Sequence, residues 1–195
     1  MAKLSLPCDQ AQIRALRVGD EALLSGRLIT ARDTAHHWLA GAFREEVAPY
    51  LAGSIIYHCG PVVRRNPDGS YTFVAAGPTT SAREEPYQAD VIGRYGVRGV
   101  IGKGGMFEKT QQALVEHGAV YLHAVGGAAQ LLARSVLRVE RVFKLEEFGV
   151  PEAMWVIAVE DFPTVVTMDA HGGSLHDEIA EGSNAVLEKL LGKAG

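Results

Sequence analysis

Three short segments of the sequence, each at the exit of an expected strand, are rich in residues that bind anions. They are TARDTAH at 30–36, GPTTSAR at 77–83 and IGKGG at 101–105. Each contributes one cation, and these are Arg32, Arg83 and Lys103. An arginine can bind a carboxylate through two parallel hydrogen bonds, and a lysine adds a compact charge. If the three segments meet in space, the sequence predicts a binding site for an anion.

The second segment also carries neighbouring hydroxyl groups, among them Thr79 and Thr80, directly after a Gly-Pro turn. Hydroxyls and backbone N–H groups add neutral donors to an anion site. Each segment has a plainer interpretation when taken alone. GPTTS can be an ordinary turn with hydroxyl caps, and Arg32 with Asp33 can be a local ion pair and a helix cap. GKGG at 102–105 lacks the spaced first glycine and the Ser/Thr of a Walker A loop.

The elements that would position these segments alternate between strands and helices. Strands are expected at 21–31, 54–59, 71–76 and 97–105, the last with a glycine-rich exit, and a helix is expected after 32 with Asp33 as its N-cap. This order favours a layered α/β domain with a parallel central sheet and a second antiparallel sheet. In such domains ligands gather at the carboxyl ends of parallel strands. The three segments are therefore expected at one edge of the sheet.

The C-terminal part of the chain predicts two strands and a closing helix. MWVIAVEDF and TVVTMDA are expected to be strands joined by a tight turn at Pro163. The helix begins at 174, where Ser174 and Asp177 fit a capping box. Its apolar side chains recur at helical spacing, which predicts a stripe facing the core: Leu175, Ile179, Val186 and Leu190.

Length and composition limit the class of protein. The chain has 195 residues, expected to form a single domain over 1–195, and a net charge of −4 without the basic patches of a nucleic-acid-binding protein. No apolar run approaches the roughly 18 residues that span a membrane. Because the N-terminus MAKLSLPCDQ lacks the apolar core of a signal peptide, a cytoplasmic location is expected.

Cysteine and histidine are too sparse for a metal centre built from this chain alone. Cys8 and Cys59 are far apart in the sequence, and two thiolates fall short of an iron–sulfur cluster's usual ligands. The pair His36-His37, with one ring facing solvent, has no third ligand at suggestive spacing. The stretch Tyr57-His58-Cys59 is interpreted as core packing rather than as a nucleophile with its base.

Five stretches of the sequence together resemble a known family. They are GDEALLSGRLITARDTAHHWL, AGPTTSAR, GVRGVIGKGG, GAVYLHAVGGAAQLLA and PEAMWVIAVEDFPTVVTMDAHG. They resemble, in order and over nearly the whole chain, the β subunit or C-terminal domain of the iron–sulfur class I fumarases, a family that includes L(+)-tartrate dehydratase β subunits. One departure is the pair Glu84-Glu85, where the family often has Met-Asp after the motif arginine.

The resemblance implies a fold and a reaction. The fold would be the swivelling β/β/α domain, and the reaction the reversible addition of water to a C4 dicarboxylate such as fumarate. Motif by motif, the substrate-carboxylate ligands would be Arg32, Arg83 and Lys103. Thr79 would match the proposed catalytic base, with Thr80 beside it. A threonine hydroxyl is a weak base, so a neighbouring charged group would have to tune it.

The resemblance also implies a partner. The family's chemistry uses a [4Fe–4S] cluster, which the two cysteines of this chain cannot hold, so the cluster is expected on a partner α subunit. The active site would then lie at a subunit interface. Two alternatives stay open: an L(+)-tartrate dehydratase β subunit, and a non-catalytic anion-binding swivelling module. Self-association of the isolated chain also stays open.

Overall fold

The computed structural model describes residues 1–192. A seven-stranded sheet has the order β1-β2-β3-β6-β7-β9-β8, and β4 pairs with β5 in a separate hairpin. The strands are β1 (Ala2–Leu6), β2 (Glu21–Thr30), β3 (Ile55–Tyr57), β4 (Val62–Arg65), β5 (Tyr71–Ala75), β6 (Gly99–Gly102), β7 (Val120–His123), β8 (Val136–Phe143) and β9 (Met154–Met168).

The large sheet has a parallel half and an antiparallel half. Neighbouring strands from β1 to β7 run parallel, whereas β9 runs antiparallel to β7 and to β8. The long strand β9 also pairs with β2 along most of its length. The two halves therefore close on each other, which confirms the predicted α/β architecture with a parallel central part and an antiparallel second layer.

Two separate apolar clusters fill the spaces between the layers. Side chains alternate along a strand, and on β3 the side chains of Ile55 and Tyr57 join one cluster while Ile56 joins the other. Similarly, on β9 Trp155 belongs to the first cluster and Val156 to the second. The first cluster lies between the two halves of the sheet, and the second lies under the helices.

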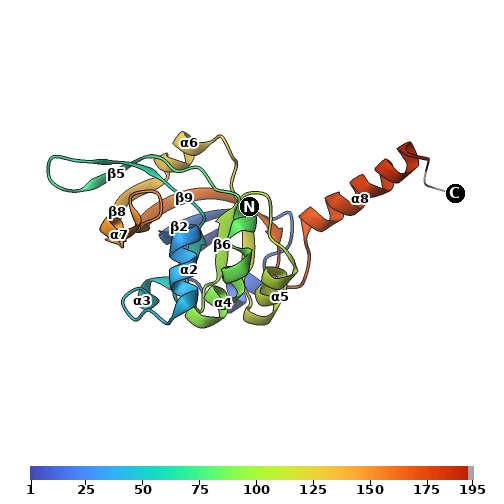
Figure 1. Cartoon of the computed structure of the whole chain (residues 1–195), viewed down its shortest axis with the longest axis horizontal. Helices are drawn as coiled ribbons and strands as arrows, with labels where there is room; N and C mark the ends of the chain where they lie inside the picture. Colours follow the sequence, from blue (N-terminus) through green and yellow to red (C-terminus); the bar gives the residue numbers. More distant parts are fainter. Residues whose placement is uncertain (193–195) are drawn as a thin grey trace.

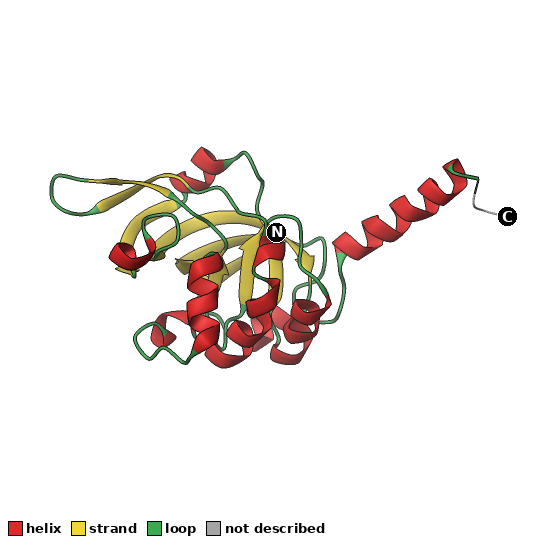
Figure 2. Cartoon of the chain, viewed as in Figure 1, coloured by secondary structure: helices red, strands yellow, loops and turns green. Residues whose placement is uncertain are grey.

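Helices cover one face of the parallel half, as Figures 1 and 2 show for α2, α4 and α5. The glycines that end α4 and α5, Gly96 and Gly118, adopt left-handed conformations, which relieves the last turn of each helix. The helices are α1 (Gln10–Arg14), α2 (Asp33–Gly41), α3 (Ala48–Leu51), the 3-10 helix η1 (Ser81–Arg83), α4 (Glu85–Tyr95), α5 (Glu108–His117), α6 (Ala129–Arg134), α7 (Leu145–Phe148) and α8 (Leu175–Leu190).

The prediction of two strands joined by a turn at Pro163 is wrong. β9 runs through this position without reversing, and Pro163 pairs with Leu23 of β2. The chain bends instead at Asp161, whose backbone φ is 47° and whose N–H donates to the Ser25 hydroxyl. The register shifts at this level of β2, and such a bulge bends a strand without ending it.

The predicted core stripe on the last helix is also wrong. Ser174 caps α8 by accepting a hydrogen bond from the N–H of Asp177, as expected. However, no residue of α8 is buried, and Ile179, Val186 and Leu190 are 59%, 56% and 79% exposed. Figure 1 shows α8 extending away from the body. An amphipathic pattern predicts an apolar face but not the surface that covers it. Within residues 1–192, no helix has both the length and the apolar character for crossing a bilayer.

Candidate functional site

The loop that carries Thr79 and Thr80 lies directly beside Lys103. The backbone N–H of Lys103 donates to the carbonyl of Thr79 over 3.3 Å, and the N–H of Ser81 donates to the carbonyl of Lys103 over 3.1 Å. Thr80 and Lys103 form an isolated parallel bridge. The N–H of Thr79 donates to the carbonyl of His58, just beyond β3, over 2.7 Å. These bonds anchor the segment after β5 between the exits of β3 and β6, and they bring two of the three predicted segments together.

The third predicted segment joins them through an ion pair. The guanidinium Nη2 of Arg83, at the end of η1, donates to Oδ2 of Asp33, at the start of α2. Arg83 remains about half exposed, with a side-chain exposure of 53%. Burial alone would raise the pKa of Asp33, but a hydrogen bond with Glu84 and the charges of Arg83 and Arg32 hold it below its ordinary value. Asp33 is therefore a carboxylate that lies between two candidate substrate ligands.

Arg32, rather than the predicted Asp33, is the N-cap of α2, and it makes no side-chain capping bond. Its Nε lies 3.4 Å from Oε1 of Glu152, and a side chain at Gly60 would collide with its guanidinium. The cap for the first turn comes instead from Glu152, whose Oε2 accepts from the N–H of Thr34 over 3.1 Å. Because this long-range contact supplies the capping acceptor, local sequence could not identify it.

A buried polar network underlies the segment at 77–83, which we call the threonine loop. Nδ1 of His58 lies 2.8 Å from the Ser81 hydroxyl oxygen, and Nε2 lies 2.8 Å from Oε1 of Gln88. The hydroxyl of Tyr121 donates to the same Ser81 oxygen over 2.9 Å. Because the Gln88 oxygen can only accept, His58 carries its proton on Nε2, and Ser81 donates to Nδ1. All four side chains thus hold one another in a single arrangement.

A second buried histidine lies against the first. The rings of His36 and His58 meet edge to face with centroids 5.0 Å apart. Nδ1 of His36 donates to the carbonyl of Arg32 over 3.0 Å. Burial lowers the pKa of His36 to about 4 and that of His58 well below its usual 6.5. Both imidazoles are therefore neutral near pH 7, and the network ties the segment of Arg32 to the threonine loop.

Two of the predicted glycines are needed for close approach. A side chain at Gly102 would collide with the Ser81 hydroxyl, and one at Gly105 would meet the ring of His176 at 2.6 Å. Gly105 also has a φ of 76°, which disfavours other residues. The glycines around Lys103 therefore allow neighbouring side chains, rather than only a ligand, to pack on this loop.

The residues of the buried network are not among the predicted site residues. His58 and Cys59 are both buried, which confirms the prediction that they pack in the core. Burial raises the pKa of the Cys59 thiol to about 12, so it is not a thiolate near pH 7. A polar residue inside an apolar run, such as His58 in SIIYHC, was the available signal, because a buried polar group needs a partner.

The residues described by the structure do not form a metal centre. Within 1–192, no group of three or more His, Cys, Asp or Glu side chains is arranged to hold a metal ion. Cys8 and Cys59 are both buried and free. The donor set on this part of the chain therefore does not fit an iron–sulfur cluster.

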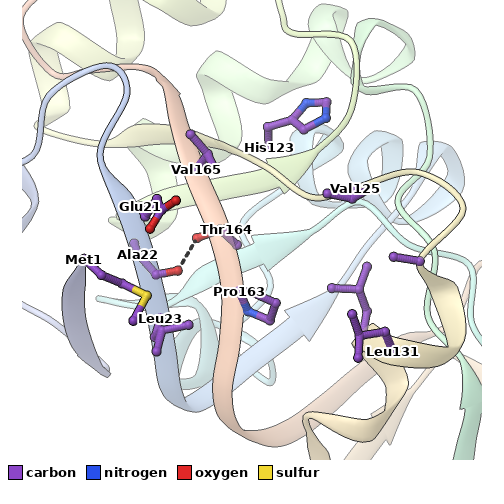
Figure 3. Close-up of a pocket in the computed structure, with 12 residues that line it drawn as sticks. Met1, Glu21, Ala22, Leu23, His123, Val125, Leu131, Pro163, Thr164 and Val165 are labelled. Carbon is purple, nitrogen blue, oxygen red and sulfur yellow. Dashed lines mark hydrogen bonds between the residues drawn. The ribbon is translucent and has the colours of Figure 1, made fainter.

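A separate apolar pocket lies between β2, β9 and the segment around α6 (Figure 3). Its volume is about 270 Å³, and Leu23, Leu131 and Val165 are among the side chains that line it. The lining includes Glu21 and His123 but none of the three candidate cations. This pocket lacks the positive charge that binding of a dicarboxylate would require.

Comparison with known proteins gives the family. Residues 2–179 match the family model described as Fumarase C-terminus. Over 188 residues the chain is 53% identical to a provisionally named fumarate hydratase class I of Geobacillus stearothermophilus, a match that covers 96% of this chain but 35% of that relative. The chain thus spans little more than a third of that protein.

Two further relatives have nearly the same length as this chain. One is the L(+)-tartrate dehydratase subunit beta of Escherichia coli (strain K12), 38% identical over 193 residues, which cover 96% of this chain and 94% of the relative. The other is a protein provisionally given the same name in Methanocaldococcus jannaschii, 40% identical over 183 residues, which cover 92% and 93%. Since the family model covers most of the chain and these relatives match almost from end to end, the chain belongs to the Fumarase C-terminus family.

Proposed function

We propose that the chain is the β subunit of a two-subunit iron–sulfur hydro-lyase that adds water to fumarate to form L-malate. One observation carries this proposal: the segment that contains Thr79 and Arg83 lies directly beside Lys103, in a chain of this family. Hydration adds a hydroxyl group to one alkene carbon and a proton to the other. The site must therefore hold two carboxylates and move one proton.

The cations are assigned to the carboxylates. Arg83 is half exposed, and among residues 1–192 its ion-pair partner is Asp33, so its guanidinium can turn from Asp33 to a substrate carboxylate. Lys103 follows β6 and adds a second positive charge beside Thr80. Arg32 is less exposed, at 20%, and would contribute a cation from the floor of the site. Two arginines and one lysine can compensate both charges of a dicarboxylate.

Thr79 is assigned to proton transfer. Its backbone is held on both sides, by the carbonyl of His58 and the N–H of Lys103, which anchors this residue in its loop. A hydroxyl is a weak base, and the neighbouring Lys103 supplies a charge that can stabilise its deprotonated form. Thr80 is assigned a supporting hydrogen bond.

The [4Fe–4S] cluster is assigned to a partner α subunit. When bound there, it would supply a Lewis-acidic iron for the substrate hydroxyl. Two exposed apolar side chains, Phe107 and Val125, would lie at this subunit interface, and Val125 also lines the pocket of Figure 3. Phe107, 62% exposed, donates its N–H to Glu85 over 3.0 Å, and Val125, 64% exposed, precedes Gly126, which packs near Lys103.

L(+)-tartrate dehydratase is the second candidate, because the two relatives of nearly equal length carry that name. The higher identity to the fumarate hydratase class I relative favours fumarate. The test is to co-express the chain with a partner that carries three or more cysteines and to reconstitute the cluster without oxygen. Fumarate, malate and tartrate are then assayed side by side, with the isolated chain as control. Fumarate hydration by the complex, but not by the isolated chain, supports the proposal. Turnover of tartrate only, of none of the three, or by the isolated metal-free chain would contradict it.

A further inference from the structure

Two carboxyl groups behind Arg83 face each other without enough donors for both to be ionised. Glu84 is fully buried, and among residues 1–192 neither of its carboxylate oxygens has an N–H or O–H partner. Oδ1 of Asp33 is also buried and without such a donor, while Oδ2 is bound by Arg83. Glu84 directly follows Arg83, and Arg83 binds Asp33, so the buried Glu84 carboxyl lies next to this ion pair. A hydrogen bond between the two carboxyl groups lowers the pKa of Asp33 and raises that of Glu84. A direct carboxyl–carboxylate contact requires a proton between the oxygens.

We propose that Glu84 and Asp33 share one proton, and that this pair is a positioning device that sets how strongly Asp33 holds Arg83. The reading of Arg83 as a substrate ligand rests on the proposed function. The shared proton itself rests on the buried oxygens, the Asp33–Arg83 ion pair and the hydrogen bond between the two carboxyl groups.

The surroundings decide which carboxyl carries the proton. Burial, followed by the hydrogen bond and the charge of Asp33, raises the pKa of Glu84 to about 8. Asp33 is stabilised as an anion by Arg83 and Arg32. The other titratable groups that face the pair are the Tyr121 hydroxyl from β7 and the neutral ring of His36 from α2. At pH 7, Glu84 therefore donates its proton to Oδ1 of Asp33, whose Oδ2 accepts from Arg83.

The pair links proton binding to anion binding. With Glu84 protonated, Arg83, Asp33 and Glu84 together are neutral, and Arg83 can leave Asp33 for a substrate carboxylate. When Glu84 ionises, a second negative charge lies behind Asp33. This charge holds Arg83 more tightly and repels an incoming dianion. Substrate affinity is therefore expected to fall as the pH rises through about 8.

The shared proton can be tested on the full chain without activity. Carboxyl carbons of Glu and Asp labelled with ¹³C are followed by NMR between about pH 5 and pH 10 in wild type, in Glu84→Gln and in the control Glu146→Gln, an exposed site. One carboxyl should titrate near pH 8 in wild type and in the control and vanish in Glu84→Gln. Asp33→Asn should move this titration to lower pH, because it removes a neighbouring charge. Absence of such a carboxyl in wild type, or its survival in Glu84→Gln, would overturn the proposal.

The link to Arg83 is tested in the reconstituted complex with its dicarboxylate substrate. Wild type should lose affinity by up to about tenfold per pH unit above pH 8, the limit for one coupled proton. Glu84→Gln, which is neutral and can still donate an N–H to Asp33, should change by less than about twofold over the same range. An equal alkaline loss in both proteins would overturn the positioning role. If the complex turns over none of fumarate, malate and tartrate, the proposed function fails. The NMR result still decides whether Glu84 and Asp33 share a proton.

Discussion

The Nδ1 atom of His58 lies 2.8 Å from the hydroxyl oxygen of Ser81, at a point where all three predicted segments meet. Ser81 belongs to the threonine loop, and its hydroxyl oxygen packs on Gly102, which lies in the segment 101–105 that carries Lys103. His58 lies against His36, whose Nδ1 bonds to the carbonyl of Arg32. A neutral, fully buried set of side chains therefore supports residues that are themselves partly exposed. Such support fixes the geometry of a charged site without adding charge to it.

Replacing Ser81 by Ala should destabilise the chain. The substitution leaves Nδ1 of His58 and the Tyr121 hydroxyl buried without their shared partner. An unsatisfied buried polar group costs about 1–3 kcal/mol. The free energy of unfolding in urea measures the loss. Tyr121→Phe should cost less, and in the double variant the losses should not add, because both changes break the same network. Strict additivity would show that the two hydroxyls act independently.

Arg83→Ala should raise the Michaelis constant for the dicarboxylate and lower turnover in the reconstituted complex. Where docking of the partner subunit buries the contact between Arg83 and the substrate, truncating Arg83 should cost about 2–5 kcal/mol. Arg83→Lys should recover only part of the loss, because the lysine lacks the planar fork. Arg94→Ala is a suitable control: its guanidinium bonds to the carbonyls of Leu39 and Ala40, on α2 rather than on the threonine loop. Wild-type kinetics for Arg83→Ala would exclude Arg83 from the site.

Thr79→Val keeps the shape of the side chain and removes its hydroxyl. If Thr79 transfers the proton, turnover should fall by about 100-fold or more, the usual contribution of a positioned acid or base. The Michaelis constant should change little, because the cations hold the carboxylates. Thr80→Val should have the smaller effect. Exchange of the proton at C3 of malate with solvent isolates this step, and a wild-type exchange rate in Thr79→Val would assign the base elsewhere.

Acid should destabilise the chain through its two buried histidines. The folded-state pKa of His36 is about 4, below its ordinary 6.5, and that of His58 is also lowered. Between pH 6.5 and about pH 4, the unfolded chain binds a proton at His36 that the folded chain does not bind. The free energy of unfolding therefore falls as the pH drops through this range. The slope is up to about 1.4 kcal/mol per pH unit for each proton. The check is urea unfolding of wild type and His36→Asn between about pH 7 and pH 4.

His37→Asn serves as the matched control for that experiment, because the neighbouring ring of His37 is exposed. The difference in free energy between His36→Asn and wild type should depend on pH, since asparagine binds no proton in either state. The same difference for His37→Asn gives the effect of removing an imidazole from the protein surface. A pH-independent difference for His36→Asn would mean that this imidazole is accessible to protons in the folded chain.

Local sequence determined much of this protein. The Gly96 and Gly118 helix ends, the Pro-Asp-Gly turn between β4 and β5 and the strand exits that carry Thr79 and Lys103 follow from residue types within a few positions of one another. Backbone conformations depend on short-range sterics and hydrogen bonds, so they can be predicted from the order of residues. The strands also placed the two loops at one edge of the sheet, because the carboxyl ends of parallel strands meet there.

The tertiary structure decided which groups face each other. Asp33 binds Arg83 fifty positions away, and Glu152 rather than Asp33 caps α2. Nothing near Glu84 in the sequence indicated that its carboxyl would be buried against Asp33. The apolar side chains of α8 have helical spacing in either case, yet they remain exposed. Spacing defines which side chains share a face, whereas the partner of that face depends on contacts between distant segments, and these form only when the chain folds.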